Sequence, residues 1–271
     1  MKQKEAIKKQ LDLEPNNHIY ILTISIIVIA LVLWSATSVN FNGIEEGSSV
    51  IGAKIIKGII NPDLNFLFDI GEGGVLYLLF ETICIAFLGT IIGSILAIPF
   101  AFISAKKIMP KPVAFVGRIL TMAVRTVPSL VYGLMFIRVS GPGPFTGVLT
   151  MAVISIGMIT KLYINAIEDI DVNIIDSLAS MGLNRFDQIR YGILPQLYSN
   201  FISIVIYRFD MNLRDASVLG LVGAGGIGAP LIFAMNSYRW NEVGSLLIGL
   251  VVLVLLIEAF SNRVRKKLVR G

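Results

Sequence analysis

Charged side chains interrupt two apolar stretches of this sequence, and they are the groups best suited to contact an ion. Arg125 lies near the middle of one stretch, and another ends in the cluster Arg208, Asp210, Arg214 and Asp215. An unpaired charge at the centre of a bilayer costs about 2.5–3.5 kcal/mol on insertion scales, so such a group must face a partner or water. A planar guanidinium matches the oxygens of an anion, which makes Arg125 a candidate for lining an anion path. A structural ion pair or bonding to backbone carbonyls explains Arg125 equally well.

Asp210 and Arg214 are four residues apart, so on a helix they share one face and can form an ion pair. This pairing favours a structural role for Arg214 over substrate binding. Serine hydroxyls near these arginines can add polar lining. The candidates for a translocation path are therefore Arg125, Ser129, Arg214 and Ser217.

The sequence offers no constellation of residues for catalysis or metal binding. It contains one histidine, His18, and one cysteine, Cys84, so neither an internal disulfide nor a His/Cys metal cluster can be assembled. No Walker A pattern, G-x-x-x-x-G-K-[ST], occurs, and the glycine-rich residues 71–74 lack the lysine. We expect no catalytic residues, no metal, no cofactor and no ATPase site in this chain.

The composition predicts that lipid is the solvent of most of the chain. Of its 271 residues, 55% are hydrophobic and 15% are charged, and the mean hydropathy is +0.78. A soluble domain usually carries about 25% charged residues. The net charge of +5 is small and sits mostly at the two ends, which favours a topological role over nucleic-acid binding.

Apolar windows long enough to cross a bilayer, roughly 20 residues each, predict an all-α membrane protein. The first window follows several lysines and is too long for a signal-peptide core, so we expect a retained membrane anchor. About six transmembrane helices are expected, at approximately 18–37, 75–104, 113–139, 147–166, 196–213 and 241–260.

The distribution of basic residues predicts the orientation. With six crossings, the lysines before the first window, those at 106–111 and the basic residues of the tail all fall on one side, which the positive-inside rule makes cytoplasmic. Both termini are then cytoplasmic, and the polar run 167–195 is too. The predicted parts are an N-terminal cytoplasmic segment, first transmembrane helix and extracytoplasmic loop (1–74), a transmembrane domain (75–262) and a basic cytoplasmic tail (263–271).

The polar run 167–195, hereafter the bracket, predicts two short helices. In the first, Ile174, Leu178 and Met181 recur at helical spacing and give one apolar face. Gly182 can adopt a positive φ and end that helix, which places Leu183 for an apolar contact back onto the last turn.

The second bracket helix is predicted from its own capping signals. Asn184 can cap it, with Asp187 three residues on in the manner of a capping box. Phe186 and Ile189 are expected to point inward. Pro195 suits the first turn of the next membrane helix, where a backbone amide is spare. The bracket is interpreted as a docking surface for a cytoplasmic motor, with a solvated helical loop as the alternative.

The bracket resembles the EAA signature of ABC importer permeases. The match consists of Asp176-Ser177-Leu178, then Gly182, then Leu194-Pro195. Asp replaces the usual Glu, Ser-Leu replaces Ala-Ala, and Gly192 stands where Ile is usual. In that family this loop inserts into the ATP-binding subunit. The resemblance implies that the ATPase-coupling residues here are Asp176, Ala179, Gly182, Leu183 and Pro195.

Further strings resemble the phosphonate permeases of the PhnE type over roughly residues 75–262. The longest and most specific runs from Leu213 to Gly228, LRDASVLGLVGAGGIG. Asn165 departs from that family, which often has an acidic residue there. The shorter strings are Arg125-Thr126-Val127-Pro128-Ser129, Lys161-Leu162-Tyr163 and Ala166-Ile167-Glu168.

The glycines within the longest string also fit the dinucleotide pattern G-x-G-x-x-G. That pattern needs a preceding strand and a βαβ unit, and the surrounding sequence predicts neither. A flexible or closely packed backbone between the last two spans is favoured. The functional alternative is that this backbone forms a re-entrant or gate-like segment. The gate candidates are Gly223, Gly225, Gly226 and Gly228.

The resemblance implies a type I ABC importer permease with a MetI-like core, which forms the pore for a phosphonate or related phosphorus oxyanion. It implies two copies of a cytoplasmic ATP-binding subunit, a second permease copy or a paralogue, an extracytoplasmic substrate-binding protein, and a location in the cell membrane. A permease of the same fold for another solute such as an amino acid, an ATP-independent secondary transporter, and a membrane anchor without transport are the alternatives.

Overall fold

The computed structural model of the protein describes residues 17–38 and 48–270, and every regular element in them is helical. The chain divides into two compact units, Met1–Gly52 and Ala53–Gly271. The N-terminal lysines used in the orientation argument lie outside the described residues.

The first unit contains α2 (His18–Ser38), which is apolar on all sides and buries none of its residues. A helix without a polar face is suited to lipid rather than to a water-facing surface. Its bounds agree with the first predicted span.

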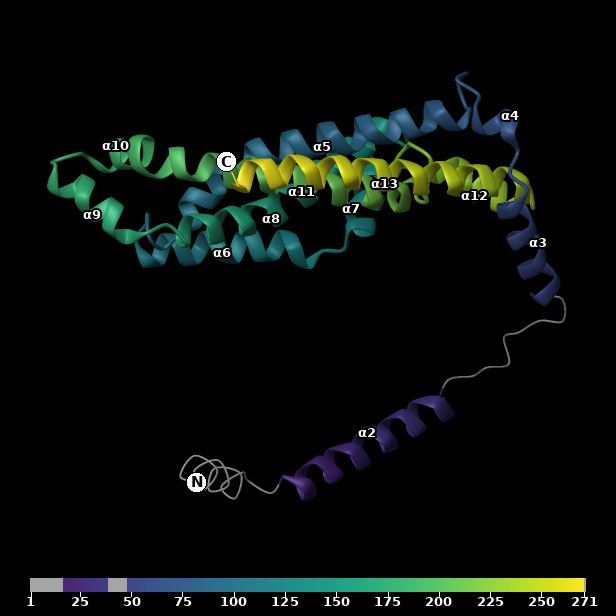
Figure 1. The fold of residues 1–271 in the computed structure, drawn as a ribbon, viewed down its shortest axis with the longest axis horizontal. Helices are drawn as coiled ribbons and strands as arrows, with labels where there is room; N and C mark the ends of the chain where they lie inside the picture. Colours follow the sequence, from purple (N-terminus) through teal and green to yellow (C-terminus); the bar gives the residue numbers. More distant parts are fainter. Residues whose placement is uncertain (1–16, 39–47, 271) are drawn as a thin grey trace, which may run out of the picture. The chain divides into compact units, whose positions relative to one another are not determined.

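The second unit is a bundle built around α5 (Val75–Ser104) and α8 (Pro144–Glu168), which form its most extensive helix pair. Figure 1 shows the long helices of this unit running side by side, with α9 and α10 extending beyond one end and α4 and α12 at the other. The division between the two units falls inside α3 (Ser48–Ile60). The remaining elements of the second unit are α4 (Leu64–Leu67), α6 (Lys111–Thr126), α7 (Ser129–Ser140), α9 (Val172–Ser180), α10 (Arg185–Asp187), a π-helical segment (Gln188–Ile193), α11 (Leu194–Gly220), α12 (Gly228–Asn236) and α13 (Trp240–Arg270).

Glycines bring α5 and α8 into close contact. A Cβ atom on Gly89 would lie 2.3 Å from Cβ of Met151, and one on Gly93 would lie 2.5 Å from Cβ of Ser155. Small residues at helix crossings allow the backbones to approach closely and to gain van der Waals contact. In lipid this contact drives helix association, because the hydrophobic driving force between helices is missing there. The α5–α8 pair therefore forms the rigid centre of the bundle.

The apolar core consists of three clusters along the bundle. At the end that carries α9, the rings of Tyr163 on α8 and Phe201 on α11 stack with centroids 3.8 Å apart. At the opposite end, Val75 and Leu78 of α5 pack with Leu246 of α13. Each end of the bundle is thus held by its own packed cluster.

Five of the six predicted spans fall entirely on helical residues and the span 113–139 falls on two helices, but the structure does not establish the number of membrane crossings. Four helices, α2, α5, α8 and α13, are long and apolar enough to cross a membrane, and the pair α6 and α7 would make a fifth if it counted as one bent span. The 27-residue α11 is long enough but more polar. The count of six therefore stays a prediction.

One continuous helix over 113–139 is a wrong prediction. Helix α6 ends at Thr126 and α7 begins at Ser129, and the two are bent by 82°. Val127 is extended, with φ −80° and ψ 124°, because a residue before proline avoids the helical region. Pro128 also lacks the N–H that would continue the ladder. Arg125 consequently lies in the last turn of α6, at a break, rather than in the middle of a helix.

Replacing Gly93 by valine tests the α5–α8 contact. The added side chain collides with Ser155, and overpacking of this kind costs about 1–3 kcal/mol. We expect the detergent-purified protein to lose its monodisperse state at a clearly lower temperature. The matched control is Gly52→Ala, because a Cβ at Gly52 meets nothing within 4 Å. Equal heat resistance of Gly93→Val and the wild type would contradict the close packing.

Candidate functional site

The predicted end of the first bracket helix at Gly182 is confirmed by the backbone geometry. Gly182 has φ +81°, and its N–H donates to the Ala179 carbonyl at 3.0 Å. The N–H of Leu183 donates to the Leu178 carbonyl at 3.3 Å. This pair of bonds is a Schellman motif, in which a residue of positive φ satisfies the last carbonyls of a helix. Gly182 therefore sets the direction in which the chain returns to the bundle.

The second half of the bracket begins as predicted and then departs from an α-helix. The side-chain oxygen of Asn184 accepts a hydrogen bond from the Asp187 N–H at 2.9 Å, which confirms the cap. After α10, however, residues 188–193 form a π-helix that runs directly into α11. Pro195 lies in the first turn of α11, where it has no N–H and its ring crowds the carbonyl of Tyr191. A widened turn relieves that crowding, and no sequence rule applied above predicts it.

The bracket keeps large apolar side chains at its surface. Met181 is 75% exposed and Phe186 is 69% exposed, so the prediction that Phe186 points inward is wrong. Ile189 does pack against the core cluster at this end of the bundle. The π-helical turn changes the angle between successive residues. Phe186 and Ile189 therefore do not share the inward face that α-helical spacing predicted. Exposed apolar groups rimmed by polar residues are typical of a protein-binding surface.

The coupling candidates from the sequence lie together on the bracket. Asp176, Ala179 and Gly182 are exposed around the end of α9, and Leu183 is half-buried at the turn. Pro195 is separate from them, at the start of α11. Figure 1 shows this region at the tip of the bundle, beyond α6 and the C-terminal end of α13.

A polar junction ties the base of the bracket to the bundle. Glu168, the last residue of α8, accepts a hydrogen bond from the Lys106 N–H at 3.1 Å and forms an ion pair with Arg118 of α6. Lys107 donates to the carbonyl of Ile170 at 2.7 Å. Because the partners are at least 50 positions apart in the sequence, no local pattern could have indicated this junction. A displacement of the bracket would be transmitted through it to α5 and α6.

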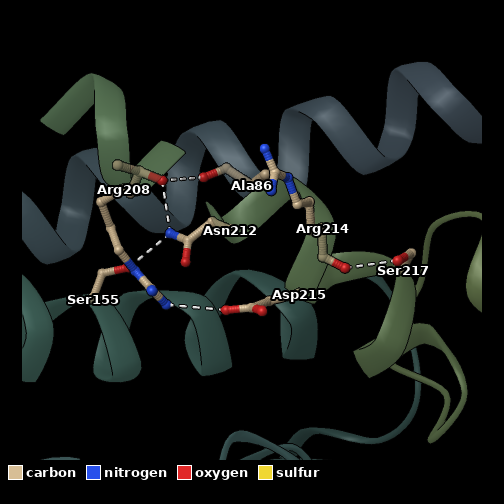
Figure 2. Close-up of polar contacts among 8 residues, drawn as sticks. Ala86, Ser155, Arg208, Asn212, Arg214, Asp215 and Ser217 are labelled. Atoms are coloured by element: carbon tan, nitrogen blue, oxygen red, sulfur yellow. Dashed lines mark hydrogen bonds and ion pairs between the residues drawn. The ribbon is translucent and has the colours of Figure 1, made fainter. Parts of the chain in front are cut away.

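A buried polar cluster joins α5, α8 and α11 in the middle of the bundle (Figure 2). Asn212 is fully buried, and its side-chain nitrogen donates to Thr90 at 2.8 Å and to Ser155 at 2.7 Å. Arg208 is 2% exposed, lies 3.4 Å from the Ser155 hydroxyl, and pairs with Asp215 at 3.3 Å. Buried polar groups in a membrane protein must find partners within the protein. The Asn212 nitrogen and the Arg208 guanidinium do, whereas the side-chain oxygen of Asn212 is buried without a hydrogen-bond partner.

The charged residues on the other side of α11 are also paired. Arg214 forms ion pairs with Asp210 and with Glu258 of α13, each at 3.0 Å, so the predicted Asp210–Arg214 pairing is present. Ser217 donates its hydroxyl to the Arg214 carbonyl at 2.6 Å. Arg125 and Ser129 flank the break between α6 and α7 instead. The path candidates thus form two pairs, Arg214 with Ser217 and Arg125 with Ser129. In the described part of the chain no hydrogen bond connects one pair to the other.

The glycine-rich segment is a closely packed turn between α11 and α12. The N–H of Gly143 donates to the Gly223 carbonyl at 2.9 Å, and the N–H of Ile227 donates to the Thr82 hydroxyl at 3.0 Å. A Cβ on Gly225 would lie 2.8 Å from Cα of Pro144. Three of the four gate candidates, Gly223, Gly225 and Gly226, have φ between +70° and +88°.

The last gate candidate makes the closest backbone contact of the four. A Cβ on Gly228 would lie 2.2 Å from the carbonyl oxygen of Ser217, so α12 begins directly against the end of α11. A side chain larger than hydrogen therefore collides with a neighbour at Gly225, Gly226 and Gly228 unless the turn shifts. No strand adjoins it in residues 17–38 or 48–270, which excludes the dinucleotide-binding interpretation.

The family described as "Binding-protein-dependent transport system inner membrane component" matches residues 97–271. The chain belongs to this family. It is a multi-pass membrane component of an ABC importer, and membership implies an ATP-binding subunit and a substrate-binding protein as partners.

The similar proteins agree on the fold. The chain is 34% identical over 189 residues to the phosphite transport system permease protein PtxC of Stutzerimonas stutzeri, which covers 69% of each chain. It is 34% identical over 228 residues to the phosphate-import permease protein PhnE of Mycolicibacterium smegmatis, covering 83% of this chain and 41% of that one. Among solved structures, the inward-facing MetNI methionine ABC transporter superposes with a TM-score of 0.62 at 17% identity, covering 73% of this chain and 99% of that chain. The predicted MetI-like permease fold is confirmed.

The Arg208–Asp215 pair can be tested by removing its members singly and together. Asp215→Asn leaves the buried guanidinium without a carboxylate, which should cost about 1–3 kcal/mol of stability. The double change Arg208→Met with Asp215→Leu should cost less than the sum of the single changes, because no unpaired charge remains. The measurement is the thermal unfolding of each purified variant, with the exposed Asp169→Asn as the control. Additive losses would show that the pair is not coupled.

Proposed function

We propose that the protein is the pore-forming permease of an ATP-driven importer for a phosphorus oxyanion, such as phosphite or a phosphonate. The observation that carries the proposal is the 34% identity to a phosphite permease across 69% of both chains. The sequence carries no Walker A pattern, so the energy comes from a separate ATP-binding subunit. The extracytoplasmic binding protein delivers the anion and sets most of the specificity.

The bracket is the proposed docking element for the ATP-binding subunit. Its exposed apolar residues Met181 and Phe186 offer a contact surface at the tip, and the Schellman turn at Gly182 gives that surface a defined shape. The bracket end of the bundle is then cytoplasmic, and both termini lie on that side. Two permease copies, each with one bracket, match a motor with two ATP-binding subunits. A second copy of this chain is the simplest partner.

The junction at Glu168 gives the proposed docking a mechanical consequence. Closure of the ATP-binding subunits moves the bracket, and the contacts of Glu168 with Lys106 and Arg118 carry that motion to α5 and α6. The 82° bend between α6 and α7 is the place in the described bundle where a membrane helix pair is already interrupted. The glycine turn at 223–228 lies at the opposite end and contacts α5 and α8, where it can respond as a gate.

Reconstitution tests the proposed substrate. Proteoliposomes containing the permease, its ATP-binding subunit and its binding protein should accumulate labelled phosphite or methylphosphonate only when ATP is supplied to the cytoplasmic side. Vesicles with the permease alone should not accumulate the anion, since the sequence carries no Walker A pattern. Uptake of methionine but of no phosphorus oxyanion would contradict the proposed substrate and support the amino-acid alternative. Full uptake without the ATP-binding subunit would support an ATP-independent secondary transporter instead.

Substitution of Gly182 tests the docking role separately. Valine in a left-handed conformation costs about 1–2 kcal/mol, so Gly182→Val should reshape the turn and lower uptake roughly tenfold while ATP hydrolysis continues. Asparagine tolerates this conformation, so Gly182→Asn is the matched control and should retain most uptake. The measurement is the ratio of substrate transported to ATP hydrolysed. An unchanged ratio in Gly182→Val would contradict docking through this turn.

A further inference from the structure

A cavity of about 150 Å³ lies between α6 and α8, in the half of the bundle nearest the bracket. Cationic side chains from both helices face it, with a threonine and two apolar residues between them. Its lining residues are Arg118, Thr121, Met122, Arg125, Lys161 and Ile164.

The helical spacing explains how the cations meet. Arg118 and Arg125 are seven residues apart on α6 and therefore lie on one face, two turns apart. On α8, Gly157 and Lys161 are four residues apart and share the facing side. A Cβ on Gly157 would lie 2.8 Å from Cγ of Arg125, so the missing side chain is what lets the arginine stem cross against α8.

The charges of this cavity are not balanced by the protein. Arg118 is neutralised by Glu168. In the described part of the chain, no ion pair and no hydrogen bond joins Arg125 or Lys161 to another side chain. The arginines of α11 differ, because both Arg208 and Arg214 have carboxylate partners. Unpaired cations on membrane helices face water or an anion, since facing lipid is costly.

We propose that Arg125 and Lys161 bind a tetrahedral oxyanion in this cavity and form the last protein site that a substrate occupies before release. The choice of a phosphorus oxyanion rests on the proposed function. A buried water needs about 10–15 Å³ of such volume, so the cavity accommodates an ion of four or five heavy atoms with hydrating water. The planar guanidinium of Arg125 supplies paired donors, and the Lys161 ammonium supplies a point charge.

The cationic face continues toward the bracket end. Lys111 precedes Arg118 by seven residues, so α6 presents Lys111, Arg118 and Arg125 at equal intervals along one side. Lys111 and Lys106 line a second, larger opening there. Successive positive charges lower the barrier for an anion that moves along them. In the proposed orientation that movement ends in the cytoplasm.

The site predicts a specific loss in transport by the complete reconstituted importer. Arg125→Gln and Lys161→Gln should each lower the maximal rate of phosphite uptake about tenfold, the effect of one charge-assisted hydrogen bond. The half-saturating phosphite concentration should not change, because the binding protein sets it. Lys266→Gln removes one exposed charge elsewhere and should transport at the wild-type rate.

A positioning role for Gly157 gives a second readout. Gly157→Ala displaces Arg125 and should lower uptake to an intermediate level, but it should add no further loss to Arg125→Gln. Arg125→Lys should restore part of the rate. Additive losses from Gly157→Ala and Arg125→Gln, or loss of uptake only in proportion to lost thermal stability, would show that these residues are merely structural.

Direct binding separates this site from the proposed function. Inorganic phosphate added to the permease–ATPase complex in phosphatidylcholine nanodiscs should show a broadened ³¹P resonance, which Arg125→Gln and Lys161→Gln sharpen and Lys266→Gln does not. If the wild type imports no phosphorus oxyanion but this binding difference is present, the proposed function fails and the anion site stands. If both variants import phosphite at the wild-type rate, the site fails and the proposed function stands.

The phosphate group of an anionic lipid has the same chemistry as the substrate. If phosphatidylglycerol in the nanodisc abolishes the phosphate signal, and both variants lose one bound lipid by native mass spectrometry, a lipid headgroup occupies the cavity and the proposal is overturned. A phosphate signal that persists in phosphatidylglycerol supports the substrate site.

Discussion

The close crossing of α5 and α8 is the constraint on which the rest of the bundle depends. Gly93 leaves room for Ser155 to lie directly against α5, and the hydroxyl of Ser155 then accepts from Asn212 and lies within hydrogen-bonding distance of Arg208 on α11. A larger residue at position 93 would move the hydroxyl that organises the third helix. In lipid, where apolar packing between helices gains little, such backbone proximity and internal hydrogen bonding supply the specificity that a hydrophobic core supplies in water.

The arginines on the membrane helices fall into two groups with different consequences. Arg208 and Arg214 have carboxylate partners, and their contacts hold α11 to α8 and α13. Arg125 stands at a helix break with no such partner in the described residues, opposite a glycine that admits its stem. Pairing makes a charge part of the scaffold, whereas an unpaired charge is available to a mobile ion. The same residue type therefore serves stability in one place and proposed ligand binding in the other.

The side chain of Arg118 connects the bracket to the cationic cavity. Arg118 lines the cavity and also pairs with Glu168, from which the bracket departs. The bracket is therefore connected to the cavity in two ways, through this ion pair to α6 and along the chain to Lys161 of α8. This arrangement offers a short physical route by which ATP-driven motion could change the affinity of an anion site, because the two share a side chain rather than a long chain of contacts.

Local features of this protein could be predicted from its sequence, and long-range ones could not. The positions of the longest helices, the Gly182 turn, the Asn184 cap and the Asp210–Arg214 pair follow from periodicity and from residues within a few positions of one another, whereas the break between α6 and α7 was missed. The π-helical turn escaped prediction because it arises from a conflict between Pro195 and the preceding turn rather than from any residue preference. Tertiary structure alone decided that Asn212 would join three helices, that Glu168 would meet Arg118, and that Lys161 would share a cavity with Arg125. The reason is that a helix specifies which residues share its face, but only packing specifies what that face meets.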